Sequence, residues 1–357
     1  MNQKTEIPLT VKRSIELLGL FILGYIIYVG SDIIMPILMA FFLTIMILPI
    51  HRFLRKKKFP ESLAILTPII VLLLFASLII WFFSAQVQIL IADFPLIKKN
   101  VNIHLNSLSG WISGFTNIST KDQISIIKEQ SDSFLNSTGD ILSGVAGSVS
   151  GVLIFFGLLP IYIFLILYYK NMIIQFVTMW FDDKDLPQVN GSIKSIEEII
   201  KSYLIGLLIQ IAYITILLGG TLGLIGIKHA LLIGVLFAIL NLIPYVGALI
   251  GNILGVLITL SSTQETWPII TVLIVIAVVQ FLDNNILMPK IVGEKVRINS
   301  LAAIIGIVLG GTFAGISGMF LALPIIAVLK IVFDQTENFK KWGVLLGADR
   351  PERNLTK

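Results

Sequence analysis

The sequence predicts an all-α, polytopic membrane protein, and three observations lead to this class. First, 56% of the 357 residues are hydrophobic and only 13% are charged, whereas soluble domains usually carry about 25% charged residues. Second, apolar stretches long enough to cross a bilayer, about 20 residues, recur along the chain. Third, the stretch 63–83 contains no ionisable residue. A core helix of a soluble protein rarely needs such a stretch, so its recurrence indicates a membrane.

Charge and cysteine content exclude several other classes. The net charge is +5, but the basic residues lie between apolar runs, which is typical of topology signals and not of nucleic-acid binding. Cysteine is absent, which excludes disulfides, thiolate nucleophiles and Cys-ligated metals. Lys4, Lys12 and Arg13 precede the first apolar run, and no Ala-x-Ala-like cleavage site follows it. This pattern predicts a retained membrane anchor and not a signal peptide.

The apolar runs define the expected elements in chain order. They cover residues 15–30, 33–50, 62–84, 150–169, 202–227, 230–260, 268–288 and 300–330. Residues 1–84 are predicted to form three spans, and the polar residues 85–148 a water-exposed helical subdomain outside the membrane. Residues 149–201 are predicted to form a fourth span and a cytoplasmic amphipathic helix. Residues 202–333 would be a transport core and residues 334–357 a cytoplasmic tail.

Two of the runs, 230–260 and 300–330, are too long for one span. As single helices they would measure about 46 Å, against a hydrocarbon core of about 30 Å. Helix-weakening residues interrupt both near the middle: Asn241, Pro244 and Gly247 in the first, and Gly310, Gly311, Gly315 and Gly318 in the second. We therefore predict two re-entrant helical hairpins in addition to six full spans. Eight full spans are the alternative.

The distribution of basic residues favours the hairpins. In the hairpin model, all but five of the 26 Lys and Arg residues lie on the cytoplasmic side, together with both termini. With eight full spans, Lys290, Lys295 and Arg297 would move outside, which the positive-inside rule disfavours. We expect a multi-pass protein of the cell (inner or plasma) membrane with cytoplasmic N- and C-termini.

A span followed by a broken run occurs twice, as 202–227 with 230–260 and as 268–288 with 300–330. In the hairpin model the two units have opposite orientations, which is the sequence pattern of secondary transporters with inverted repeats. Interrupted helices free backbone polar groups at membrane depth, and those groups must be buried or must contact water or substrate. Alternatively, glycines such as those of Gly311-x3-Gly315 only permit close helix packing.

Several motifs in the C-terminal half resemble the autoinducer-2 exporter family, also described as PerM-like permeases. They are Pro-Tyr-Val-Gly within 241–247, Asp283-Asn284-Asn285, Met288-Pro289-Lys290-Ile291-Val292-Gly293, the glycine-rich stretch 306–318, and Leu321-Ala322-Leu323-Pro324. The plan of spans is similar across nearly the whole chain. Ala248 and Asn299 depart from the pattern, because relatives often have proline there, and this affects local loop geometry.

The resemblance implies a function. It implies export of a small polar, furanone-type signal molecule (autoinducer-2, AI-2) or of another solute through the lipid bilayer. Some relatives are described as sodium/proton antiporters, so protons or sodium are further expected partners. The resemblance also implies a homo-oligomer, with a pentamer as the expected size, and a moving transport domain.

Candidate pathway residues gather at the two breaks and at the end of the run 268–288. Asp283 is charged and close to the hydrocarbon, which makes it a candidate for carrying a coupling proton or sodium; a helix-end residue bonded to headgroups is the alternative. The predicted pathway comprises Asn241, Pro244, Tyr245, Gly247, Asp283, Asn284, Asn285, Pro289, Gly310, Gly311, Gly315 and Gly318. Gln210 and Thr215, inside the run 202–227, are predicted to form interhelical hydrogen bonds.

Enzyme chemistry finds little support. Gly315-Ile316-Ser317-Gly318 matches a motif of intramembrane serine proteases, but that chemistry needs a histidine base on a later helix. All three histidines, His51, His104 and His229, lie upstream. The chain also lacks a phosphate-binding loop and a His-Glu-x-x-His motif. We therefore predict a non-enzyme without cofactors: an exporter of a small polar solute, with a cation/proton antiporter and a non-transporting accessory protein as alternatives.

Overall fold

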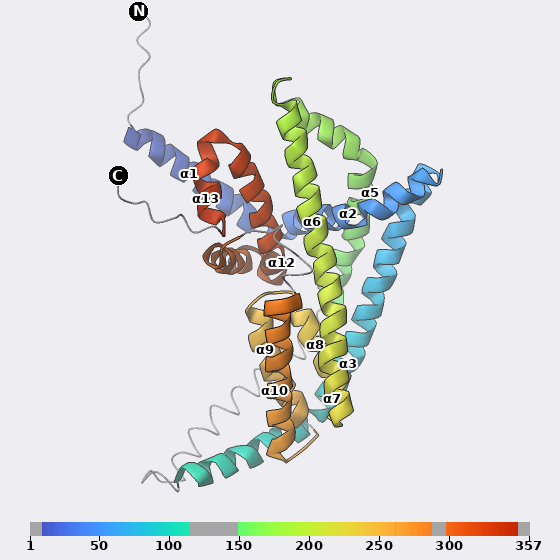
Figure 1. The fold of residues 1–357 in the computed structure, drawn as a ribbon, viewed down its shortest axis with the longest axis vertical. Coiled ribbons are helices and arrows are strands. Elements are labelled where there is room, and N and C mark those ends of the chain that lie inside the picture. The colour runs from blue at the N-terminus through green and yellow to red at the C-terminus, as the bar shows by residue number, and fades with distance from the viewer. Residues whose placement is uncertain (1–8, 114–148, 261, 288–297, 349–357) are drawn as a thin grey trace, which may run out of the picture. The chain divides into compact units, whose positions relative to one another are not determined.

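The computed structural model describes residues 9–113, 149–260, 262–287 and 298–348, and within these ranges the chain is helical and contains no strand (Figure 1). The helices are α1 (Leu9–Val29), α2 (Ser31–Lys56), α3 (Glu61–Ser113), α5 (Val149–Thr178), α6 (Leu186–Ile214), α7 (Gly220–Ile225), α8 (Ala230–Leu240), α9 (Val246–Leu260), α10 (Thr266–Leu282), α12 (Ser300–Gln335) and α13 (Lys340–Leu346). Two π-helical turns, η1 (Thr215–Gly219) and η2 (Asp283–Leu287), follow α6 and α10, and a 3-10 turn, η4 (Glu337–Phe339), precedes α13.

The predicted class, an all-α polytopic membrane protein, is confirmed. Within the described ranges, six helices are long and apolar enough to cross a membrane: Ser31–Lys56, Glu61–Gln86, Gly157–Thr178, Leu186–Ile225, Thr266–Leu287 and Ser300–Gln335. The prediction also gave six full spans, but the two sets do not contain the same helices. The set includes 300–335, whereas the apolar part of α1, Leu17–Val29, is shorter than a span. The count of full spans therefore stays a prediction.

Two helices are longer than the sequence pattern predicted. Helix α3 continues past residue 84 to Ser113, so the first part of the predicted outer subdomain is helical; residues 114–148 of that subdomain lie outside the described residues. The predicted amphipathic helix before residue 201 is the N-terminal half of α6 and continues into the following span. No proline interrupts residues 188–214, so nothing local ends the helix between its polar and apolar halves.

The chain forms two compact units, each assembled from separate stretches of sequence. Unit 1 comprises residues 1–49, 158–200 and 297–357, and unit 2 comprises residues 50–157 and 201–296. The predicted transport core, 202–333, is therefore divided: the first broken run belongs to unit 2 and the second to unit 1.

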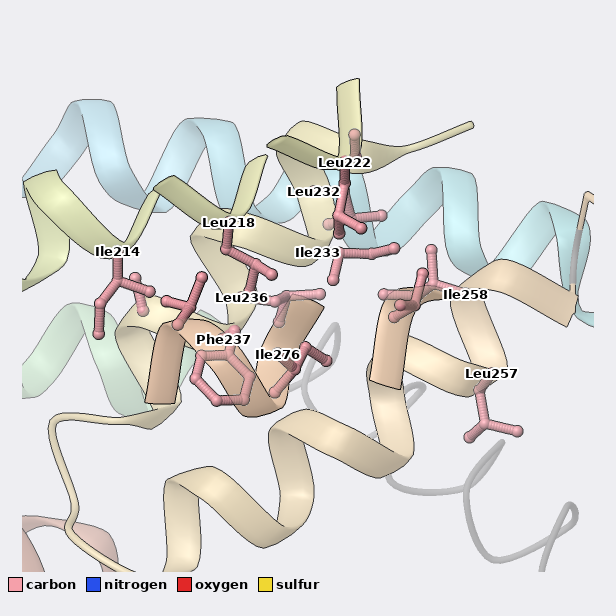
Figure 2. Packing of buried hydrophobic residues seen from close by; sticks show 14 of the residues in the cluster. Ile214, Leu218, Leu222, Leu232, Ile233, Leu236, Phe237, Leu257, Ile258 and Ile276 are labelled. Carbon is pink, nitrogen blue, oxygen red and sulfur yellow. The ribbon is translucent and has the colours of Figure 1, made fainter. Parts of the chain in front are cut away.

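Unit 2 contains a continuous apolar core formed by α6, η1, α7, α8, α9 and α10, together with Ile97 of α3. Figure 2 shows Phe237 and Leu236 of α8 among Ile214 and Leu218 on one side and Ile276 of α10 on another. Phe237 is only 1% exposed. Because lipid tails are as apolar as these side chains, close van der Waals packing, and not exclusion from water, is what favours this arrangement over contact with lipid.

The first broken run is interrupted where the sequence predicted. Helix α8 ends at Leu240, Asn241 caps it, and α9 starts at Val246. Pro244 has no N–H and disfavours helical backbone in the residue before it. Tyr245 adopts a left-handed φ of 66°. A Cβ atom on Gly247 would overlap the carbonyl group of Leu240, so the two limbs approach closely beside the break.

The second broken run, α12 in unit 1, is also interrupted. Ala314 has φ −149° and ψ 26°, and Gly315 has φ 56° and ψ −140°, a combination that is essentially restricted to glycine. The limbs on either side fold back on each other, because a Cβ atom on Gly310 would overlap the backbone carbonyl of Gly318. Gly311 packs against the Met319 side chain of the facing limb, as the packing alternative expects, whereas Gly315 lies at the reversal itself and meets nothing within 4 Å. The placement of both hairpins in the bilayer stays a prediction.

Candidate functional site around Asp283

Asp283 is the most deeply buried acidic side chain among the described residues, with 1% of its surface exposed. It caps the C-terminus of α10 and opens the π-helical turn η2. A π-helical turn shifts the hydrogen-bond pattern from i→i+4 to i→i+5 and is frequent at functional sites. The turn therefore sets the direction of the Asp283 carboxylate independently of the regular helix before it.

Three neutral donors from two other segments point at this carboxylate. The Gln210 Nε2 atom donates to Asp283 Oδ2 over 2.8 Å, and the Asn241 Nδ2 atom donates to the same oxygen over 3.0 Å. The Tyr213 hydroxyl donates to Oδ1. Gln210 and Tyr213 are three residues apart on α6 and so share one face of the helix. Asn241 comes from the break between α8 and α9. The site thus joins α6, the first break and the end of α10, all within unit 2.

The charge on this carboxylate has no counter-ion among the described residues. No described Lys, Arg or His side chain forms an ion pair with Asp283. Burial of an ionised carboxylate is strongly unfavourable unless it is paired or hydrogen-bonded. The three donors supply hydrogen bonds, which are stronger to a charged acceptor than to a neutral one. Among the described residues, neutral donors alone therefore hold this side chain.

Three buried side-chain oxygens in unit 2 have no hydrogen-bond partner, and one of them belongs to a residue that contacts the carboxylate. Within the described ranges, Gln210 Oε1, Gln280 Oε1 and Thr215 Oγ1 are buried and have no hydrogen-bond partner. Gln210 contacts Asp283 directly, whereas the Gln280 amide donates to the exposed Asn284. Thr215 opens η1, five residues after Gln210. Buried polar atoms in proteins nearly always have a partner, so these oxygens are free to accept hydrogen bonds from a ligand or from water.

The structure brings together only some of the predicted pathway residues. Asn241 and Asp283 are in direct contact, as described above. Pro244, Tyr245 and Gly247 form the neighbouring break, where Tyr245 is 57% exposed and Gly247 is buried. Asn284 and Asn285 are exposed and form other hydrogen bonds. Asn284 accepts a hydrogen bond from Gln280, and Asn285 donates to the Phe281 carbonyl.

The structure does not place the remaining predicted pathway residues in this cluster. Pro289 lies outside the described residues. Gly310, Gly311, Gly315 and Gly318 form the reversal of α12, which belongs to unit 1, whereas Asp283 belongs to unit 2.

Sequence reasoning missed Tyr213 and underrated Gln210. Gln210 does form the predicted interhelical hydrogen bond, and its partner is Asp283. One sequence feature could have identified both residues: Gln210 and Tyr213 are two polar side chains at i, i+3 spacing within a largely apolar span. Within the described ranges no cluster of three or more His, Cys, Asp or Glu side chains could hold a metal ion.

Comparison with known proteins identifies relatives along nearly the whole chain. Residues 17–338 match the model of the family described as AI-2E family transporter. The chain is 26% identical over 309 residues to "Putative transport protein YrrI" of Bacillus subtilis (strain 168), covering 85% of this chain and 86% of that protein. It is 29% identical over 323 residues to "Putative transport protein YueF" of the same organism, covering 85% and 84%. It is 21% identical over 321 residues to "AI-2 transport protein TqsA" of Escherichia coli (strain K12), covering 89% and 90%.

Proposed function

Because the chain belongs to the AI-2E family of transporters, we propose that it is a secondary transporter that exports a small polar solute through the site around Asp283. The chain is a multi-pass membrane protein of a transporter family. AI-2 is the candidate solute, supported by the resemblance of the motifs and by the name of TqsA. The observation that carries the proposed site is the buried Asp283 carboxylate, which has neutral donors but no counter-ion within the described residues.

A purely structural role would not require a charged group at this position. An amide could accept and donate hydrogen bonds there at a much lower desolvation cost, because a charged side chain inside a membrane is expensive. The carboxylate is therefore best explained by a ligand that uses its charge. Gln210, 3% exposed, presents its unpaired Oε1 oxygen beside it.

The chemistry of the cluster fits a solute that carries hydroxyl groups. A hydroxyl both donates and accepts. It would find acceptors in Asp283, in Gln210 Oε1 and in the Tyr213 hydroxyl oxygen, and a donor in the second hydrogen of Asn241 Nδ2. Asn241 belongs to the break between α8 and α9. Movement of the break would therefore withdraw one donor from the carboxylate, which would link solute binding to the movement of that segment.

The test is the substitution Asp283→Asn in the full-length protein, reconstituted into vesicles. We expect solute flux to fall to the level of protein-free vesicles, while size-exclusion elution and native mass spectrometry of the purified protein stay unchanged. Native mass spectrometry also measures the proposed homo-oligomer. Glu265→Gln is the matched control, because it makes the same chemical change at the opposite end of α10, at an exposed position. Full transport by Asp283→Asn would remove the proposed role of this carboxylate.

The same site supports the alternative of a monovalent cation/proton antiporter, because a lone buried carboxylate can bind a proton or a sodium ion. This alternative requires cation-dependent pH changes inside vesicles in the absence of the solute, whereas the exporter requires flux of the solute itself. Vesicles that move neither solute nor protons would favour a non-transporting accessory protein.

A further inference from the structure

The segment after α12 turns back and binds the start of the same helix. The backbone N–H of Asn299 donates to the Leu346 carbonyl over 3.1 Å. The Asn299 Nδ2 atom donates to the carbonyls of Leu345, over 2.6 Å, and Gly347, over 3.0 Å. A proline at this position would lack both the N–H and the amide side chain. Asn299 therefore allows three hydrogen bonds that proline could not form.

The other end of α12 also holds α13. A Cβ atom on Gly343 would overlap the Asp334 carboxylate, so the two helices approach closely at this point. The rings of Phe333 and Phe339 stack with centroids 5.6 Å apart. Helix α13 thus contacts both the beginning and the end of α12. We call these two ends, which lie together because the helix folds back, the base of α12.

This base coincides with the end of the apolar part of the chain. Residues 300–329 contain no ionisable side chain, whereas Lys330, Asp334, Glu337, Lys340 and Lys341 follow within twelve positions. In the predicted re-entrant placement of α12, both limbs lie in hydrocarbon, and the base of the helix lies where hydrocarbon gives way to lipid headgroups. Helix α13, which is bonded to that base, lies at the same level.

The outer face of α13 carries aromatic, aliphatic and basic side chains. Gly343 faces α12 and is buried. At 100° per residue, Lys341 and Leu345 point to the opposite side, and Trp342 and Val344 flank them. Trp342 is 56% exposed and Leu345 is 59% exposed. Tryptophan prefers the boundary between headgroups and acyl chains, and lysine extends its ammonium group from there to the headgroups.

We propose that this outer face of α13 binds the anionic surface of the membrane, with Trp342 and Leu345 in the boundary between headgroups and acyl chains and Lys341 among acidic headgroups. Lys340, exposed at the start of the helix beside this face, adds a second positive charge. The combination of an apolar stripe with lysines is typical of helices that lie in the interface plane. Clusters of basic residues next to a span are attracted to acidic lipids. Through Asn299, this contact would anchor the base of α12 to the bilayer surface.

The absence of cysteine makes the test direct. A single cysteine at Leu345 is labelled with an environment-sensitive fluorophore, and the full-length protein is reconstituted into vesicles of phosphatidylcholine with or without phosphatidylglycerol. We expect blue-shifted emission, quenching by lipids brominated in the acyl chain, and loss of quenching by aqueous iodide. The control, a cysteine at the exposed Glu337, should remain accessible to iodide. These changes at Leu345 should be larger in vesicles that contain phosphatidylglycerol. In Lys340→Gln/Lys341→Gln, emission and quenching should be the same with and without phosphatidylglycerol.

Two outcomes would overturn the proposal. Equal iodide quenching at Leu345 and Glu337 in both vesicle types would show that water covers this face. Protection from iodide without quenching by brominated lipid would show that protein covers it, for example a second copy of the chain. If the Leu345→Cys protein does not elute as folded, Val344→Cys provides the same measurement from the neighbouring exposed position.

Discussion

Replacing Gly310 with alanine tests the reversal inside α12. A Cβ atom on Gly310 would overlap the carbonyl oxygen of Gly318 and come within 2.8 Å of its carbonyl carbon. Both atoms are backbone and cannot move aside without shifting a whole limb. The neighbouring Gly311 provides a matched control, since a Cβ atom there would meet the Met319 side chain, with its Cε at 2.6 Å. That side chain is flexible and can rotate away.

The expected magnitudes follow from this difference. Overpacking a close contact costs about 1–3 kcal/mol, and a backbone–backbone overlap belongs at the upper end. Alanine is a better helix former than glycine by about 1 kcal/mol, which offsets part of that cost. We expect Gly310→Ala to lower the free energy of unfolding by about 2 kcal/mol. Gly311→Ala should change it by less than about 1 kcal/mol.

Thermal unfolding of both variants, purified in the same detergent, measures the difference. A loss of about 2 kcal/mol corresponds to a Tm lower by about 4–8 °C for chains of 150–250 residues, and the shift in a longer chain is of that order or smaller. If Gly310→Ala unfolds at the wild-type temperature, the two limbs are not in backbone contact. A larger loss in Gly311→Ala would likewise contradict the geometry.

Three further predictions address unit 2. Phe237→Ala should lower the free energy of unfolding by about 3–5 kcal/mol, because the ring is buried in the core; an unchanged midpoint in a denaturant titration would contradict that packing. Burial lowers the pKa of His229, Lys228 lowers it further, and Asp93, whose Oδ2 lies 3.5 Å from Nε2, raises it only in part. The folded state therefore binds fewer protons, so stability falls as pH drops below about 6.5 towards the lowered value. Asparagine tolerates the left-handed backbone at this position, so His229→Asn should reduce this loss of stability at low pH. Equilibrium unfolding at a series of pH values measures it. Single cysteines at Lys228 and Glu265 should both react with a membrane-impermeant reagent from outside, and labelling from inside would refute the hairpin topology.

The class of the fold and the two breaks could be predicted from local properties. In a bilayer every backbone polar group must be satisfied within the segment, so long apolar runs become helices whatever surrounds them. Pro244 and Gly315 act through their own backbone preferences, and neither effect depends on distant residues. The extents of α3 and α6 could not be predicted in the same way, because no residue near 84 or 201 ends a helix locally.

Asp283 and Asn241 could be recognised as candidates because a charged or amide side chain stands out in an apolar run. Their partners depended on how the helices pack. Asn284 and Asn285 adjoin Asp283 in sequence, but consecutive residues of a helix point in different directions, and both are exposed. Tyr213 is separated from Asp283 by 70 residues, and only the packing of unit 2 brings its hydroxyl to the carboxylate.

The sequence by itself therefore determined that this protein is a helical membrane protein with two interrupted runs, since chain composition and backbone preference act locally. Only the tertiary structure decided that a break from one run, two residues of α6 and the end of α10 meet around one carboxylate, which has no counter-ion within the part of the chain that the structure describes. It also decided that α13 is hydrogen-bonded to the start of α12 and packs closely against its end. Hydrogen bonds between distant segments depend on the mutual placement of helix faces, which a single sequence does not record.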